Sequence, residues 1–217
     1  GLTSTVMAAI AETQLAALSA SQFAALTTAA LAGLTATSLG ALAATQLAAL
    51  GQTQIAALTT ASLPGLTETQ LAALTTTQLA ALTATQMGAL SSTAVASLSE
   101  TQVASLTTTQ IRGLTSSVLG ALSQEDLSEL IATQLSSLTA TQLRGLSESQ
   151  LTGLTATQFA LLTSTELGAL TVTQIGYLGT EQIAALTTTQ LAGFTRSGLA
   201  AFSSEQIAAL APTQLAS

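Results

Sequence analysis

The sequence predicts an all-α solenoid of very short helices, with one helix for each eight-residue repeat. Three observations predict this fold class. The motif Leu-Thr-x-Thr-Gln-Leu-Ala-Ala recurs from Leu2 to Ser217 as 27 octads, without insertion or deletion. Residues that begin and anchor a helix recur at fixed octad positions. The period of eight fits neither a β-strand nor one continuous helix.

Each octad carries the signals of a helix start. Counted from each Leu, position 1 is Leu in 24 octads, and position 6 is apolar in all 27. Position 2 is Thr or Ser in 21 octads, and position 5 is Gln in 18. A Thr or Ser N-cap followed three residues later by Gln is a capping box, and the apolar residues at positions 1 and 6 flank it as a hydrophobic staple. We therefore expect about six helical residues in each octad.

The two simpler secondary structures fail on geometry. In a β-strand, positions 1 and 6 would face opposite sides, because side chains alternate along a strand. In a continuous α-helix, eight residues advance the apolar stripe by roughly 80° beyond two full turns. The stripe would wrap around the helix and never form a stable seam.

Proline, glycine and acidic residues occur in the octads where a helix is expected to begin or end. Pro212 falls at the first helical position, where proline is tolerated. Acidic residues at the first two helical positions suit the positive end of the helix dipole. Pro64, at position 7, indicates that the helix has loosened by that point. Glycine at position 8 suits a helix end; it occurs at Gly33, Gly65, Gly113, Gly145, Gly153 and Gly193.

Helices this short are unstable alone, so stability is expected from stacking into coils. We expect two or three octads per coil, with positions 1 and 6 facing inward and Ala or Gly at positions 7 and 8 allowing close approach. Residues 1–217 are interpreted as a single array, and we expect a fragment of a longer one because the octads run to both ends without distinct caps. The octads at 26–33, 106–113 and 186–193 are similar, which hints at an 80-residue duplication.

Composition excludes several classes of function. The chain has three Arg, no Lys, no His, no Cys and a net charge of −7. Nucleic-acid binding is not expected, because it needs clustered basic residues. Membrane insertion is not expected either, because Thr, Ser or Gln interrupts nearly every octad. No hydroxyl has a His or Lys to activate it, so we expect no enzyme, and hence no catalytic residue. We also predict no cofactor and no metal site.

The remaining polar and aromatic groups are interpreted as structural. Glu125, Asp126 and Glu129 form the densest acidic cluster, but no calcium-loop spacing accompanies them, and a solvated helix start explains them. Glu166 replaces Gln and can still complete a capping box. Arg112 and Arg144 are too few for an anion site. The aromatic residues sit at or near core positions of the octad: Phe23, Phe159, Tyr177, Phe194 and Phe202.

The segment Leu-Thr-Thr-Thr-Gln-Leu-Ala-Ala-Leu at 74–82 resembles octapeptide arrays of large bacterial exoproteins described as adhesin-like, haemagglutinin-like or haem-utilisation proteins. The resemblance covers the whole chain and implies an extracellular or cell-surface bacterial protein. Haem binding is not carried over, because His and Cys are absent. The same nonamer is similar to the first helix of transcription activator-like effector repeats, whose second helix, base-reading loop and basic surface are missing here. DNA reading is therefore rejected.

We expect a non-enzymatic structural scaffold or stalk of a bacterial surface or secreted protein, self-associating into fibres or contacting neighbouring repeats of its parent protein. Two alternatives remain open. A protein-binding solenoid would gather Arg112, Arg144, Tyr177 and the acidic octad on one face. An ice-binding protein would present the Thr side chains of positions 2 and 4 on one flat exposed face, and would show thermal hysteresis.

Overall fold

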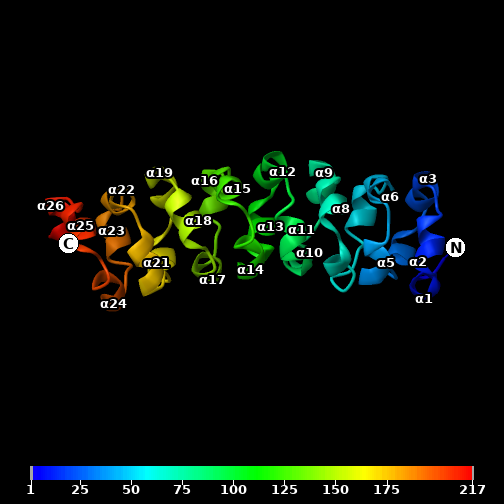
Figure 1. The fold of residues 1–217 in the computed structure, drawn as a ribbon, viewed down its shortest axis with the longest axis horizontal. Helices are drawn as coiled ribbons and strands as arrows, with labels where there is room; N and C mark the ends of the chain where they lie inside the picture. Colours follow the sequence, from blue (N-terminus) through cyan, green and yellow to red (C-terminus); the bar gives the residue numbers. More distant parts are fainter. Residues whose placement is uncertain (1, 217) are drawn as a thin grey trace. The chain divides into compact units, whose positions relative to one another are not determined.

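The computed structural model describes residues 2–216 and confirms an all-helical fold. Its α-helices are four to six residues long, and the part of the chain described contains no strand (Figure 1). None of the helices described is both long enough and apolar enough to span a bilayer. The chain divides into two compact units, Gly1–Leu114 and Thr115–Ser217, and each is considered by itself.

The first unit contains thirteen α-helices and one 3-10 helix in its described residues. Their bounds are α1 Ser4–Ala9, α2 Glu12–Ala16, α3 Ala20–Ala24, α4 Thr28–Leu31, α5 Ala36–Gly40, α6 Ala44–Ala48, α7 Gln52–Ile55, η1 Leu63–Gly65, α8 Glu68–Ala72, α9 Thr76–Leu79, α10 Ala84–Ala89, α11 Ser92–Val95, α12 Glu100–Ser105 and α13 Thr108–Gly113.

The second unit contains thirteen α-helices in the residues that the structure describes. Their bounds are α14 Ser116–Leu119, α15 Gln124–Ser128, α16 Ala132–Leu135, α17 Ala140–Arg144, α18 Glu148–Gly153, α19 Ala156–Phe159, α20 Ser164–Leu167, α21 Val172–Tyr177, α22 Thr180–Ala184, α23 Thr188–Leu191, α24 Arg196–Leu199, α25 Ser204–Ala208 and α26 Pro212–Leu215.

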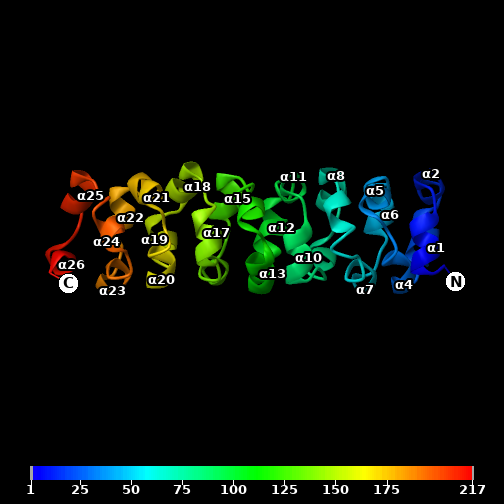
Figure 2. The same cartoon turned by 90° about the horizontal axis from the view of Figure 1, so that it is seen from below.

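Within each unit, three octads make one coil. Helices pack on the element three places away in the chain, as in α1 with α4, α10 with α13 and α20 with α23. The pairing continues through the 3-10 helix, because α5 packs on η1 and α6 packs on α8. Seen from the side, successive coils of a unit lie one after another (Figure 2). A coil therefore contains three octads, the larger of the two sizes expected.

The predicted capping box forms in the expected register. In α8, the Thr67 hydroxyl oxygen accepts the backbone N–H of Gln70 at 3.3 Å, and the Gln70 side-chain oxygen accepts the backbone N–H of Thr67 at 2.9 Å. These bonds satisfy two of the N–H groups that a helix start leaves without partners. Where position 2 is Ala, Gly or Ile, half of the box remains, as when the Gln14 oxygen accepts the N–H of Ala11 at 3.0 Å.

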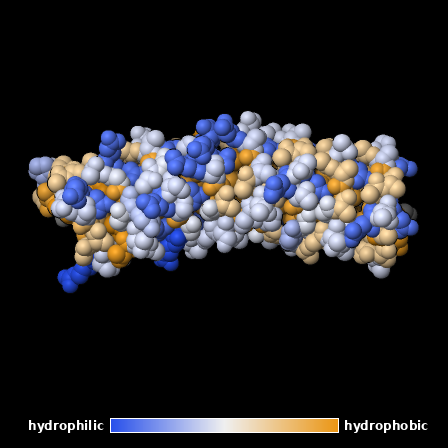
Figure 3. All heavy atoms as spheres, viewed as in Figure 1, coloured by the Kyte–Doolittle hydropathy of each residue, from blue (hydrophilic) through white to orange (hydrophobic). Residues whose placement is uncertain are grey.

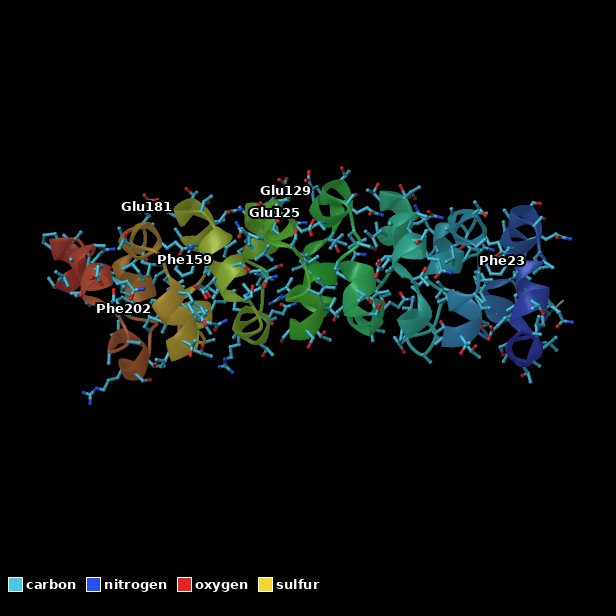
Figure 4. All side chains as sticks on the ribbon, viewed as in Figure 1. Phe23, Glu125, Glu129, Phe159, Glu181 and Phe202 are labelled. Atoms are coloured by element: carbon cyan, nitrogen blue, oxygen red, sulfur yellow. The ribbon has the colours of Figure 1, made fainter. Side chains whose placement is uncertain are left out.

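The core is a narrow column of aliphatic side chains. Residues at positions 1 and 6 point inward, and in central octads they are almost fully buried; Leu71 is 0% exposed and Leu74 is 4% exposed. Phe23 and Phe159 fill the same inward position in their octads and are fully buried (Figure 4). Burial of positions 1 and 6 is thereby confirmed, and the aromatic residues at position 6 are core residues.

The octad at 58–65 is the one place among the described residues of the first unit where the α-helix is lost. In other octads, the N–H of position 7 donates to the carbonyl of position 3, as from Ala80 to Thr76 at 2.8 Å. Pro64 occupies position 7 here and has no N–H to give. The chain instead forms a turn and the 3-10 helix η1, so the loosening expected at Pro64 affects the whole octad.

Candidate interaction surface between the coils

The glutamine at position 5 joins each coil to the one before it. Gln70 uses its side-chain oxygen to cap its own helix, and its side-chain nitrogen Nε2 donates to the carbonyl oxygens of Leu39 at 2.9 Å and Leu42 at 2.7 Å. These acceptors lie 31 and 28 residues earlier in the chain. They belong to the end of α5 and the residue that leads into α6, where helical carbonyls lack partners. One side chain therefore starts one helix and closes another.

The same arrangement repeats along both units. Gln110 donates to Leu79 at 2.7 Å and Leu82 at 2.9 Å, and Gln182 donates to Leu151 and Leu154, each at 2.8 Å. We call this set the glutamine ladder; its members are Gln46, Gln54, Gln70, Gln78, Gln86, Gln102, Gln110, Gln150, Gln158, Gln174, Gln182, Gln190, Gln206 and Gln214.

Most ladder side chains are buried, and their hydrogen bonds are complete. Gln70 and Gln110 are each 2% exposed. No buried side-chain nitrogen or oxygen among the described residues lacks a hydrogen-bond partner. Because a buried unpaired amide costs about 1–3 kcal/mol, each ladder glutamine both stabilises the stack and penalises a shifted register.

The donor role of these glutamines is the main functional feature that the sequence interpretation missed. A signal for it exists in the composition of position 5. Glu can complete a capping box as well as Gln, yet position 5 holds 18 Gln and a single Glu, Glu166. A requirement for a cap alone would not exclude Glu so strongly. The preference for an amide indicates that a donor is needed as well as an acceptor.

Glu166 is the exception that tests this explanation. Its carboxylate accepts the N–H of Thr163 at 2.6 Å, so the predicted cap is present. A carboxylate has no N–H to donate to the carbonyls of Leu135 and Leu138, which stand at the ladder spacing before it. We expect Glu166→Gln to raise the free energy of unfolding by about 1–2 kcal/mol by adding these bonds. Denaturant unfolding measures the change.

Glu181→Gln serves as the matched control for this substitution. Glu181 is exposed at the start of α22 and is not a ladder position. Its replacement is expected to change the free energy of unfolding by less than about 0.5 kcal/mol. Equal effects of the two substitutions would contradict the explanation.

Glycines mark the closest approaches between coils. A Cβ atom on Gly65 would overlap the carbonyl of Ala36, and one on Gly40 would lie 2.8 Å from the carbonyl oxygen of Gly65. No glycine among the described residues has a positive φ. Position-8 glycines do lie at helix ends, since Gly113 ends α13 and Gly145 follows α17, but none has the left-handed conformation of a glycine cap. At Gly65 and Gly113, glycine is required because the neighbouring backbone comes so close. The close approach expected at positions 7 and 8 is confirmed.

The glycine contacts repeat with the long period noted in the sequence. The pair Gly40–Gly65 recurs in the second unit as Gly120–Gly145, and the pair Gly88–Gly113 recurs there as Gly168–Gly193. In each pair, a Cβ on the first glycine would press on the carbonyl of the second. The long period thus corresponds to a repeated packing contact inside each unit.

The acidic cluster divides into a buried cap and exposed charges. Asp126 is 8% exposed and accepts the N–H and the hydroxyl of Ser123. Glu125 on α15 and Glu129, which follows the helix, are exposed to solvent (Figure 4). The part of the chain described holds no group of three or more potential metal ligands. Elsewhere, hydrogen bonds from its own backbone, then from Ser203 and Ser204, lower the pKa of the exposed Glu205.

The other polar and aromatic residues singled out in the sequence have local roles within their own units. Arg112 lies in the last turn of α13 in the first unit. In the second unit, Arg144 donates through Nε to the carbonyl of Ala169 at 2.9 Å. Arg144 therefore caps a helix end of the next coil. Tyr177 ends α21 and is half-buried. Phe194 and Phe202 stack edge to face, with ring centroids 5.4 Å apart.

The threonines at octad position 2 and those at position 4 form two rows whose hydroxyl groups have different surroundings. At position 2, the hydroxyl accepts a backbone N–H of its own helix, as Thr75 does from Gln78 at 3.2 Å. At position 4, residues such as Thr69, Thr77 and Thr109 are exposed. Residues of both rows, such as Thr75 and Thr77, are exposed, but the position-2 hydroxyls are engaged in helix caps.

Comparison with known proteins supports a repeat protein. Residues 160–196 match the profile of a family described as the ALTTAQ repeat. The matched stretch contains four complete octads, more than one coil, and covers less than a fifth of the chain. A search among curated proteins finds no match to this chain. The match and the helical stack together favour a repeat scaffold.

Proposed function

We propose that this array is a non-enzymatic structural scaffold or stalk of a bacterial surface or secreted protein. The observation that carries the proposal is the use of the polar side chains. The ladder glutamines and the position-2 hydroxyls form hydrogen bonds with the chain's own backbone. These amide and hydroxyl groups therefore stabilise the helices and the stack of coils instead of binding a ligand or substrate. Equal octads then set an equal distance per coil, which is what a spacer requires.

The surface chemistry supports the same function. Positions 3 and 4 are mostly small and uncharged, and the chain has only three basic residues. Little charge repulsion would oppose contact between neighbouring copies, and few sites are open to proteases that cut after basic residues. These properties favour a protein that works outside the cell, where arrays lie close together. We include fibre formation in the proposal on this ground.

Surface location is tested by labelling the parent protein in the organism that encodes it. Antibodies raised against the purified chain are expected to label intact cells or the growth medium, and brief protease treatment of intact cells should remove the cell-bound signal. A cytoplasmic protein serves as the control for leakage. Signal seen only after the cells are permeabilised would overturn the surface and secreted assignment, while leaving the fold untouched.

A further inference from the structure

One side of the second unit carries its surface charges in a graded order. Helices α15, α18, α21 and α24 pack one on the next in successive coils. Their first helical residues, at octad position 3, are Gln124, Glu148, Val172 and Arg196, and all four are exposed. We call these four residues the position-3 row. The row is acidic on α18, uncharged on α21 and basic on α24, so its charge changes sign along the stack.

The charges at the two ends of the row are not paired within the chain. Glu125 and Glu129 add to the acidic end, and Figure 3 shows hydrophilic residues gathered at the surface over α15. The octad around Arg196, residues 194–201, holds no acidic residue. Among the described residues, neither Glu148 nor Arg196 forms an ion pair. Both charges therefore remain available to a partner.

The middle of the row is apolar. Val172 is 54% exposed at the start of α21, and Tyr177 at the end of the same helix is half-buried. Position 3 elsewhere in the second unit holds no other aliphatic side chain larger than that of alanine or proline. An apolar centre with charges at its rim is the usual composition of a contact surface between proteins. The row thus has the character of a small interface.

We infer that two copies of this chain pair side by side and antiparallel through the position-3 row. A two-fold axis through α21 sets Val172 against the same residue of the second copy. It also sets Glu148 against Arg196 on both sides of the axis, because each contact of a two-fold interface occurs twice. A parallel pair would bring Glu148 against Glu148, which like charge disfavours. The inference rests on the proposed scaffold function and names the side on which neighbouring copies meet.

A single engineered cysteine tests the pairing. The chain has no Cys, so Val172→Cys introduces one thiol, which the two-fold axis places opposite its copy. The row offers few contacts and the pair is expected to be weak, but a disulfide formed with a mild oxidant captures it. We expect the cross-linked dimer to form about 10-fold faster than with Ile131→Cys. Ile131 is the matched control, because it is 57% exposed but precedes α16, one octad further around the coil.

Charge reversal in the Val172→Cys protein tests the antiparallel register. Arg196→Glu and Glu148→Arg should each slow cross-linking to the rate of Ile131→Cys, because opposite charges that meet become like charges. An equal mixture of these two variants restores opposite charges at both contacts and should recover most of the rate. Circular dichroism checks that each variant is folded. Equal rates at residues 131 and 172, cross-linking unchanged by the reversals, or a mixture no faster than its parts would overturn the inference without bearing on surface location.

Discussion

Replacing Gln110 by alanine is expected to lower the free energy of unfolding by about 3 kcal/mol or more. The side chain is 2% exposed and makes bonds on both sides. Its oxygen accepts the N–H of Thr107 at 2.9 Å, and its nitrogen donates to the carbonyls of Leu79 and Leu82. Truncation leaves these groups without that partner and opens a gap between α13 and the end of α9. Denaturant unfolding followed by circular dichroism gives the change in stability.

Two companion variants separate the cap from the link between coils. Gln22→Ala removes a glutamine that makes the same local cap but has no earlier coil in this chain, so it should cost only about 1 kcal/mol. Gln110→Glu keeps the cap acceptor and loses the donor, and its carboxylate faces two carbonyl oxygens, so it should destabilise at least as much as Gln110→Ala. Equal losses in Gln22→Ala and Gln110→Ala would mean that the glutamines act only as caps.

Gly113→Ala is expected to destabilise the first unit by about 3 kcal/mol. A Cβ at this position would overlap the backbone of Ala84, including its carbonyl oxygen, and the backbone of α10 has no rotamer by which to move away. The coils would have to separate locally, which would also stretch the nearby ladder bonds. The expected result is a lower unfolding midpoint in denaturant, with the slope of the transition unchanged.

Gly176→Ala is the matched control for Gly113→Ala, and it is expected to have the opposite effect on stability. Gly176 lies within α21, and a Cβ there would meet no atom within 4 Å. Gly176→Ala should therefore stabilise the protein by about 0.5–1 kcal/mol, because alanine is the better helix former. Both glycines have negative φ, so backbone strain does not separate them. If both variants are destabilised alike, close approach between coils is not the reason for the regular spacing of these glycines along the array.

The local part of the fold could be predicted from the sequence because its determinants lie within one octad. Thr67 and Gln70 are three residues apart, and their capping box depends only on that separation and on side-chain chemistry. The inward positions, such as Leu71 and Leu74, follow from their regular recurrence. In most octads the helices are shorter than the six residues expected, because positions 7 and 8 close with i→i+3 bonds, as from the N–H of Ala81 to the carbonyl of Gln78 at 3.1 Å.

The link between coils could not be predicted, because it depends on the coil size. Gln70 reaches Leu39 only when three octads complete a turn, and the octad repeats identically for coils of two or three. The glycine contacts have the same origin, since Gly65 meets Ala36 across a coil. Glycine at the end of an octad has a local explanation in helix termination, and that explanation concealed the non-local one.

The candidate interaction surface between the coils was harder to predict from the sequence than the fold. Residue types argued against many chemistries, but the surface between the coils is built from Gln and Leu, which recur throughout the repeat. Such residues carry no individual signal, because a stacking face and a core use the same side chains.

Nuclear Overhauser contacts of the Gln110 side-chain amide test the central claim most directly, that three-octad coils are joined through their glutamines. In protein labelled with ¹⁵N at glutamine, the Gln110 amide protons should show contacts to backbone protons of residues 79–83 and should exchange slowly with solvent, while those of Gln22 exchange fast. Contacts to residues one octad nearer in sequence, as a two-octad coil would give, or equally fast exchange at both glutamines, would contradict the claim.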